Sequence, residues 1–215
     1  MVEPANYQPL SGEIPSNVNV QEYFLQGSIL DANADKLKQR LQGLCDNVPP
    51  EPFTDHEQIY FLKNATSMLP IIVKACKSLA KPSTPWQIKY VGATEVGEHN
   101  KPTMIRSCVT VAVSNDPAQF LDNLGFSLQS EVILKGYFYR KGRLQITVSK
   151  ISVPPTATCD TSKLEASASS HLVEVNTTAS PRDETAGDEV KNFCQLLRPA
   201  IVLNKVDHRK LQQWQ

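Results

Sequence analysis

Residues 126–153 read FSLQSEVILKGYFYRKGRLQITVSKISV, and this stretch decides the fold class. Apolar residues stand at even positions up to Phe138 with polar residues between them, which is typical of a strand with one buried face. Residues 140–143 (RKGR) predict a turn. The alternation resumes at Leu144, and its parity changes at Ile151. We therefore expect a long antiparallel hairpin, bent by a β-bulge where the parity changes.

Further strand candidates occupy much of the remaining chain, with proline and glycine between them. A long bent hairpin among about eight strands favours a closed or nearly closed antiparallel barrel over a flat sheet. The other strand candidates are residues 20–30, 59–62, 71–76, 86–90, 105–113 and 170–175.

Helix signals interrupt the strand candidates. Asn33 is the expected cap of a first helix, and Asp116 followed by Pro117 begins a second that Gly125 can close. The predicted fold class is therefore α+β, an antiparallel β-barrel of about eight strands flanked by several helices. The apolar stripes lie at Leu37, Leu41 and Leu44 in the first helix and at Val190, Phe193, Cys194 and Leu197 in a third.

Polar, proline-containing segments set the predicted domain organisation. Residues 1–19 are expected to be a flexible leader, because prolines recur there among polar residues. Residues 20–215 are expected to form a single barrel domain. Within it, two polar stretches near 154–168 and 178–187 predict disordered loops.

The composition argues against several functional classes. Lys plus Arg is 22 and Asp plus Glu is 22, so the net charge is zero and no direct nucleic-acid partner is expected. No segment approaches the roughly 20 apolar residues that a membrane-spanning helix needs. The 5 cysteines include no Cys-x-x-Cys pair and the 4 histidines no metal-ligand spacing, so neither a disulfide framework, a metal site nor a cofactor is predicted.

Two interpretations from other classes stay open. A metal-dependent tunnel phosphohydrolase would bind triphosphates in a barrel lined with basic side chains, but it needs alternating Glu-x-Glu on its strands, a pattern that is absent. A free-standing RNA-binding barrel would show a basic groove, which the neutral charge argues against. The basic residues that could face such a lumen are Lys63, Lys74, Lys89, Arg106, Lys135 and Lys150.

Short stretches from about residue 20 onward occur in the order typical of one family. They include residues 22–31 (EYFLQGSILD), 40–47 (RLQGLCDN), 140–142 (RKG) and 191–193 (KNF). In these residues the chain resembles the subunit 18 family of the transcriptional Mediator complex. The stretch from 154 to 167 matches least.

This resemblance implies an antiparallel barrel similar in shape to the tunnel triphosphatases, a nuclear location and no catalysis. It also implies a heterodimer with Mediator subunit 20 and capture of a C-terminal helix from subunit 8. The chain would then be a scaffold in the head module, which meets RNA polymerase II directly or through other subunits. Such a role needs complementary apolar surface. Interface candidates, which can equally pack on the chain's own barrel, are Ile201, Val202, Leu203 and Trp214.

Overall fold

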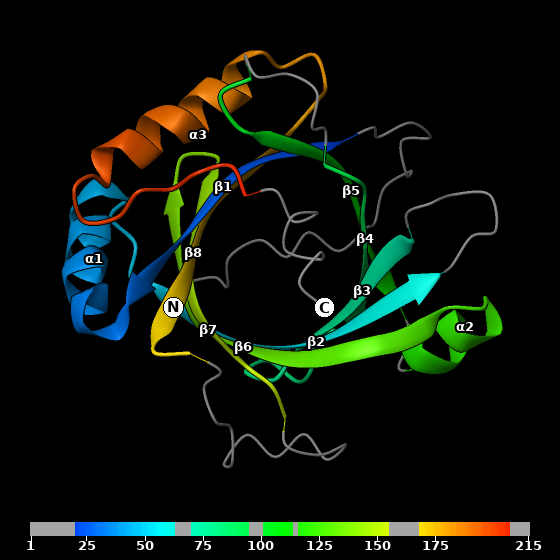
Figure 1. The fold of residues 1–215 in the computed structure, drawn as a ribbon. Helices are drawn as coiled ribbons and strands as arrows, with labels where there is room; N and C mark the ends of the chain where they lie inside the picture. Colours follow the sequence, from blue (N-terminus) through cyan, green and yellow to red (C-terminus); the bar gives the residue numbers. More distant parts are fainter. Residues whose placement is uncertain (1–19, 63–69, 95–100, 114–115, 155–167, 207–215) are drawn as a thin grey trace.

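The computed structural model describes residues 20–62, 70–94, 101–113, 116–154 and 168–206. All the strands in these ranges pair antiparallel in one closed barrel, in the order β1-β5-β4-β3-β2-β6-β7-β8 (Figure 1). The predicted barrel and its helices are thereby confirmed. The elements are β1 (Gln21–Leu30), α1 (Asp31–Leu44), β2 (Glu51–Leu62), β3 (Ile71–Ser78), β4 (Trp86–Val91), β5 (Met104–Val113), α2 (Pro117–Asn123), β6 (Ser127–Lys141), β7 (Leu144–Ser152), β8 (Ser170–Ala179) and α3 (Thr185–Leu196).

The hairpin of β6 and β7 forms as predicted, but it contains no bulge. Gly142 takes a positive φ of 56° in its turn, and the pairing runs unbroken up to Ile133 opposite Ser152. The predicted bulge is wrong because Ile151 lies opposite Leu134, on the other face from Ile146. Both faces of this hairpin carry apolar residues, so a change of parity needs no extra residue. The register shift lies instead between β2 and β6.

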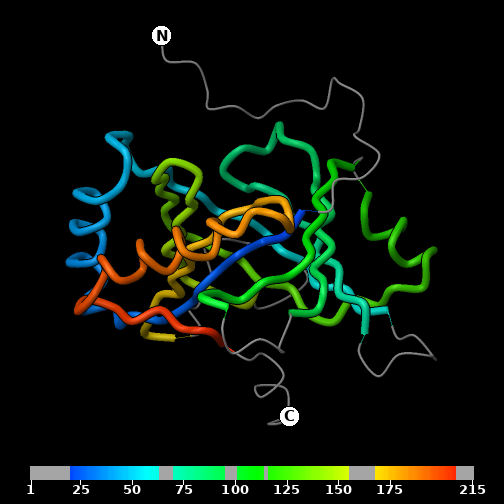
Figure 2. Tube along the Cα trace, turned by 90° about the horizontal axis from the view of Figure 1, so that it is seen from above, coloured from blue at the N-terminus to red at the C-terminus, as the bar shows by residue number. Residues whose placement is uncertain are grey.

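Helices α1 and α3 cover one side of the barrel, and α2 lies on the opposite side (Figure 2). The stripes predicted for α1 and α3 are confirmed, since Leu37, Leu41 and Val190 are fully buried in the main core with residues of β1, β7 and β8. The cap predicted at Asn33 is wrong, because α1 already begins at Asp31. Figure 2 thus shows a barrel wall with helices against some sectors only.

Helix α2 forms as its sequence signals predicted. The carboxylate of Asp116 accepts a hydrogen bond from the backbone N–H of Gln119 at 3.1 Å. Gly125 follows the helix with a φ of 87°, a conformation that favours glycine. Leu121, which is 2% exposed, packs with Tyr60 in a second, smaller core cluster on the outside of the barrel.

The structure of residues 178–187 differs from the disordered loop that the sequence predicts. Strand β8 continues to Ala179, and helix α3 begins at Thr185. The guanidinium of Arg143, which follows the β6–β7 turn, donates hydrogen bonds to Asp183, Glu189 and Thr185. Hydrogen bonds from Arg143 hold the pKa of Asp183 well below its usual range. A polar composition predicted disorder here, but charge-assisted hydrogen bonds from a distant residue order the segment. The predicted leader at 1–19 and nearly all of the predicted loop at 154–168 lie outside the described residues.

After α3 the chain crosses back over the barrel. We call residues 198–205 the C-terminal strap. The backbone N–H of Asn204 donates to the carbonyl of Gln26 at 2.8 Å, and the N–H of Gln26 donates back to Asn204 at 3.2 Å. The strap lies so close to β1 that a Cβ atom on Gly27 would stand 2.8 Å from the side chain of Leu203. Within the described residues, no helix is long and apolar enough to span a membrane.

Candidate functional site

The barrel interior was the first candidate site. Tyr23 and Leu25 of β1 pack in the main core with the outer helices, so the alternate residue Glu22 faces the lumen. The carboxylate of Glu22, whose side chain is 5% exposed, contacts Arg106 Nε at 2.6 Å and Lys89 Nζ at 3.4 Å. Burial acts to raise the pKa of Glu22, but the charges of Lys89 and Arg106 outweigh it and lower that pKa. Glu22 is therefore ionised and fully engaged by cations of β4 and β5.

A second ion pair spans β2 and β3 inside the lumen. Lys74 Nζ donates to Glu57 at 2.9 Å, and the two strands pair with Glu57 opposite Cys76. Burial acts to lower the pKa of Lys74, but Glu57 outweighs it and raises that pKa. Burial raises the pKa of the Cys76 thiol to about 12, which makes it a poor nucleophile. Burial also raises the pKa of Asp55, which lies two residues before Glu57 on the same face.

The lumen carboxylates are distributed rather than clustered. Glu174 of β8 accepts a hydrogen bond from the amide of Gln26 at 2.5 Å, so its partner differs from those of Glu22 and Glu57. Over the described ranges of the chain, no three His, Cys, Asp or Glu side chains come close enough to hold a metal ion. A hard cation needs several carboxylate ligands at one point, so this donor set does not fit the magnesium or manganese of a tunnel phosphohydrolase.

Sequence reasoning missed one lumen feature, the Asp55-x-Glu57 pair. Its signal was the alternation of two acidic residues in a strand, which a search for Glu-x-Glu alone passes over. In the structure Lys74 forms an ion pair with Glu57, and Asp55 lies opposite Ser78 of the neighbouring strand. The pair is thus built into a polar wall rather than left open to a cation.

The basic residues proposed for a lumen divide between the two faces. Lys74, Lys89 and Arg106 do lie inside, as their ion pairs with Glu57 and Glu22 show. The remaining basic candidates do not. Lys150 bonds to Asp31 of α1 at 2.6 Å on the outside, Lys135 pairs directly with Lys150 and shares that face, and Lys63 lies outside the described residues.

The outer face of β4 and β5 is the second candidate site. Tyr90 lies opposite Val109 and Ile88 opposite Val111, so these side chains form one surface. Tyr90, Val109 and Val111 are 38%, 48% and 44% exposed. Among the elements that the structure describes, no helix lies against this sector in Figure 1. We call these three residues the β4–β5 surface; contiguous exposed apolar residues of this kind mark sites of protein–protein contact.

The interface residues predicted near the C-terminus fall into different environments. Ile201 and Leu203 are 5% and 6% exposed and pack into the chain's own core, which is the second of the two alternatives that the sequence left open. They are buried because the strap pairs with β1 and turns alternate side chains inward. Val202, between them, is 49% exposed and stays a candidate. Trp214 lies outside the described residues.

Comparison with known proteins gives consistent matches over nearly the whole chain. The family model described as "Med18 protein" matches residues 21–70 and 62–213. Mediator of RNA polymerase II transcription subunit 18 of Danio rerio is 38% identical over 210 residues, covering 97% of this chain and 98% of that protein. The subunit 18 of Drosophila melanogaster is 40% identical over 193 residues, covering 88% of each.

Solved structures share the fold at low sequence identity. A chain in the Schizosaccharomyces pombe Mediator head module matches with a TM-score of 0.70 and 14% identity, over 86% of this chain and 98% of that one. The RNA triphosphatase domain of a mimivirus mRNA capping enzyme matches with a TM-score of 0.55 and 10% identity, over 85% and 90%. Fold likeness alone therefore extends to enzymes, whereas the family model and the relatives agree on Mediator. The chain belongs to the Med18 family of Mediator subunits.

Proposed function

We propose that this Mediator subunit is a non-catalytic scaffold, which supports RNA polymerase II transcription in the nucleus by holding partner subunits on the outside of its barrel. The observation that carries the proposal is the contrast between the two candidate sites. The lumen carboxylates Glu22, Glu57 and Glu174 are engaged by the chain's own side chains. The β4–β5 surface leaves apolar side chains exposed. Binding of a protein therefore fits this chain better than metal-assisted hydrolysis.

The β4–β5 surface is the proposed centre of the contact with Mediator subunit 20. A permanent subunit interface commonly buries more than about 2,000 Å², with an apolar centre. Tyr90 adds an aromatic side chain, a residue type that is enriched at such centres. The neighbouring Trp86 and Ile88 are partly buried against the second core cluster, which would hold the surface rigid.

Helix α2 offers a second apolar surface for the C-terminal helix of subunit 8. Phe120 of α2 and Leu124, the residue that caps its C-terminal end, are spaced four residues apart, and both are 54% exposed. A docked helix is held by apolar anchors at such spacings. Val202 is a further interface candidate. Through these partners and other head-module subunits the scaffold would reach RNA polymerase II, indirectly or by contact.

Co-expression with subunits 20 and 8, followed by size-exclusion chromatography, tests the scaffold role. The expected result is a stable complex of the three chains. The double variant Val109→Lys, Val111→Lys is expected to lose subunit 20, because it buries charge in an apolar interface. Val48→Lys changes a valine that is 66% exposed after α1 and is the matched control. A wild-type chain that elutes alone beside both partners would contradict the proposal.

Phosphate release from tripolyphosphate or nucleoside triphosphate, with magnesium or manganese, tests the enzyme alternative. We expect none above background. The test uses two variants of the basic lumen candidates. Arg106→Ala removes a side chain inside the lumen, whereas Lys135→Ala removes one on the outer face that Lys135 shares with Lys150. Metal-dependent release that disappears in Arg106→Ala but persists in Lys135→Ala would overturn the non-catalytic assignment.

A further inference from the structure

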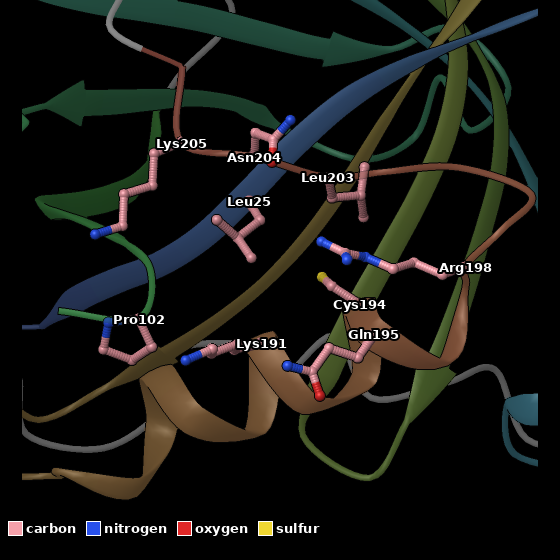
Figure 3. Close-up of a pocket in the computed structure, with 9 residues that line it drawn as sticks. All are labelled: Leu25, Pro102, Lys191, Cys194, Gln195, Arg198, Leu203, Asn204 and Lys205. Atoms are coloured by element: carbon pink, nitrogen blue, oxygen red, sulfur yellow. The ribbon is translucent and has the colours of Figure 1, made fainter. Parts of the chain in front are cut away.

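A pocket lies between α3, the start of β5 and the C-terminal strap (Figure 3). Its volume is about 230 Å³. Leu25, Cys194 and Leu203 form its apolar floor, each between 5% and 6% exposed. In Figure 3 the side chains of Arg198 and Cys194 extend toward Leu203. The pocket exists because Gly27 lets the strap approach β1, which brings Leu203 opposite α3.

Basic and amide side chains form the rim of this pocket. Lys191, Arg198 and Lys205 line it together with Gln195 and Asn204, and none of the lining residues that the structure describes is acidic. Lys205 donates a hydrogen bond to the carbonyl of Lys101. Lys191 and Arg198 form no ion pair with any residue that the structure describes. The rim therefore carries positive charge without a counterion from the described part of the chain.

The C-terminal end of α3 does not offset this charge. The carbonyl of Leu196 accepts hydrogen bonds from Arg40 Nε at 2.8 Å and Nη2 at 2.5 Å, and the carbonyl of Arg198 accepts one from Nη2 at 2.9 Å. These carbonyls form the negative end of the helix dipole, and Arg40 supplies the cation that the dipole favours. The guanidinium of Arg198 is left to the pocket.

The chemistry of floor and rim selects one class of ligand. We propose that this pocket binds an acidic peptide segment of a partner protein, which inserts one apolar side chain onto Leu25 and Leu203 and places carboxylates on Arg198 and Lys191. Arginine pairs with a carboxylate through two parallel hydrogen bonds, and the amides of Gln195 and Asn204 can bond a peptide backbone. The pocket is smaller than the 300–1,000 Å³ or so of small-molecule sites, which fits a single inserted side chain.

This site is separate from the β4–β5 surface, which belongs to other strands of the barrel, and its test does not depend on assembly with subunits 20 and 8. The probe is a fluorescein-labelled nine-residue peptide with a central Leu flanked by Asp and Glu, titrated with the full chain in fluorescence anisotropy. One control peptide replaces the acidic residues by Asn and Gln, and another replaces Leu by Ala. Both are expected to bind at least about tenfold more weakly, since each removes one of the two interactions. Binding of the acidic peptide is expected to weaken as salt is raised.

Matched variants locate the binding. Arg198→Gln is expected to lower the affinity for the acidic peptide about tenfold. Lys36→Gln removes an exposed cation of α1 outside the pocket and is expected to leave that affinity unchanged. Leu203 is part of the core, so variants of the exposed rim residues carry the test. Equal binding by wild type and Arg198→Gln would overturn the proposal, as would equal binding of the acidic and amide peptides. Displacement by inorganic phosphate at a concentration where chloride has no effect would overturn it in favour of a phosphate site.

Discussion

Strand β5 crosses two sectors of the barrel wall, and apolar side chains on its outer face are buried in one sector and exposed in the other. Ile105 lies under the outer helices and is 6% exposed, whereas Val111, further along on the same face, is 44% exposed. Both are β-branched residues in one alternating pattern. The covered sector completes the chain's own core, and the bare sector is the proposed contact with a partner subunit. The difference shows that apolar periodicity specifies a face but not what covers it.

The largest expected effect compares these two residues directly. Ile105→Ala is expected to lower the free energy of unfolding by about 3 kcal/mol, because it leaves a cavity under the helices. Val111→Ala is expected to change it by less than about 0.5 kcal/mol in the isolated chain. Urea unfolding followed by circular dichroism measures both. Similar losses would mean that Val111 is covered in the folded chain, which would remove the contrast.

The second effect concerns the opposite, lumen-facing side of β5, where Arg106 contacts Glu22 of β1. Glu22→Gln keeps the volume of the side chain but leaves Arg106 and Lys89 facing a neutral amide, and we expect a loss of about 2 kcal/mol in the free energy of unfolding. The expected value is moderate because Lys89 is partly exposed. Glu189→Gln, which alters an ion pair of a mostly exposed carboxylate on the outside, is the control and should cost less. If the two variants lose equally, the lumen pair has no special role in stability.

A smaller effect tests how the covered sector is closed. Gly27→Ala would place a methyl group 2.8 Å from the Leu203 side chain and 2.9 Å from the Val202 carbonyl, which is closer than van der Waals contact. We therefore expect the strap to shift and the free energy of unfolding to fall by about 1.5 kcal/mol. Gly43→Ala, in α1, meets no neighbouring atom within 4 Å and is expected to raise stability slightly, because alanine favours helix. Gly27→Ala should also weaken the binding of the acidic peptide. Unchanged peptide binding would mean that the position of the strap does not affect binding in the pocket.

The smallest expected effect is the pH dependence of the same lumen pair. The pKa of Glu22 is lower in the folded chain than its usual 4.5. As the pH falls through 4.5, the unfolded chain therefore takes up a proton on Glu22 that the folded chain does not yet bind. The contribution of Glu22 to stability is therefore present above about pH 4.5 and is lost below it. Glu22→Gln should therefore lose stability less steeply than the wild type as the pH falls below about 4.5. A wild-type and variant pair with parallel curves would contradict the assignment.

Local patterns predicted much of this fold. Asp116 with Pro117 marked the start of α2, and the turn around Gly142 marked the β6–β7 hairpin, because capping and turn chemistry depend on neighbouring residues. The parity change at Ile151 misled because barrel strands can be apolar on both faces. The order of residues 178–187 depends on Arg143, about forty residues earlier in the sequence, which no local pattern reveals.

The candidate sites were less accessible to prediction. The sequence predicted a strand at residues 105–113, but it did not reveal that the helices stop short of Val109 and Val111. For Ile201 and Leu203 it left an interface and the chain's own barrel as alternatives, and in the structure both side chains pack into the chain's own core. Which of two apolar segments stays exposed depends on long-range packing such as the close approach at Gly27. The lining of the pocket likewise combines residues of α3 and the strap with Pro102, and they meet only after folding.

Barrel closure has a consequence for how this protein is made. Strand β1 pairs with β5 on one edge and with β8 on the other. The second edge of β1 therefore stays unpaired until β8, which contains the partner Ala179 of Gln21, has been synthesised. A ribosome-bound chain that has emerged only as far as β7 therefore exposes unpaired backbone on β1 and on β7, and such edges invite association with other chains. Long-range closure of this kind is also intrinsically slow. Truncation before β8 should thus yield aggregates rather than a smaller soluble subunit.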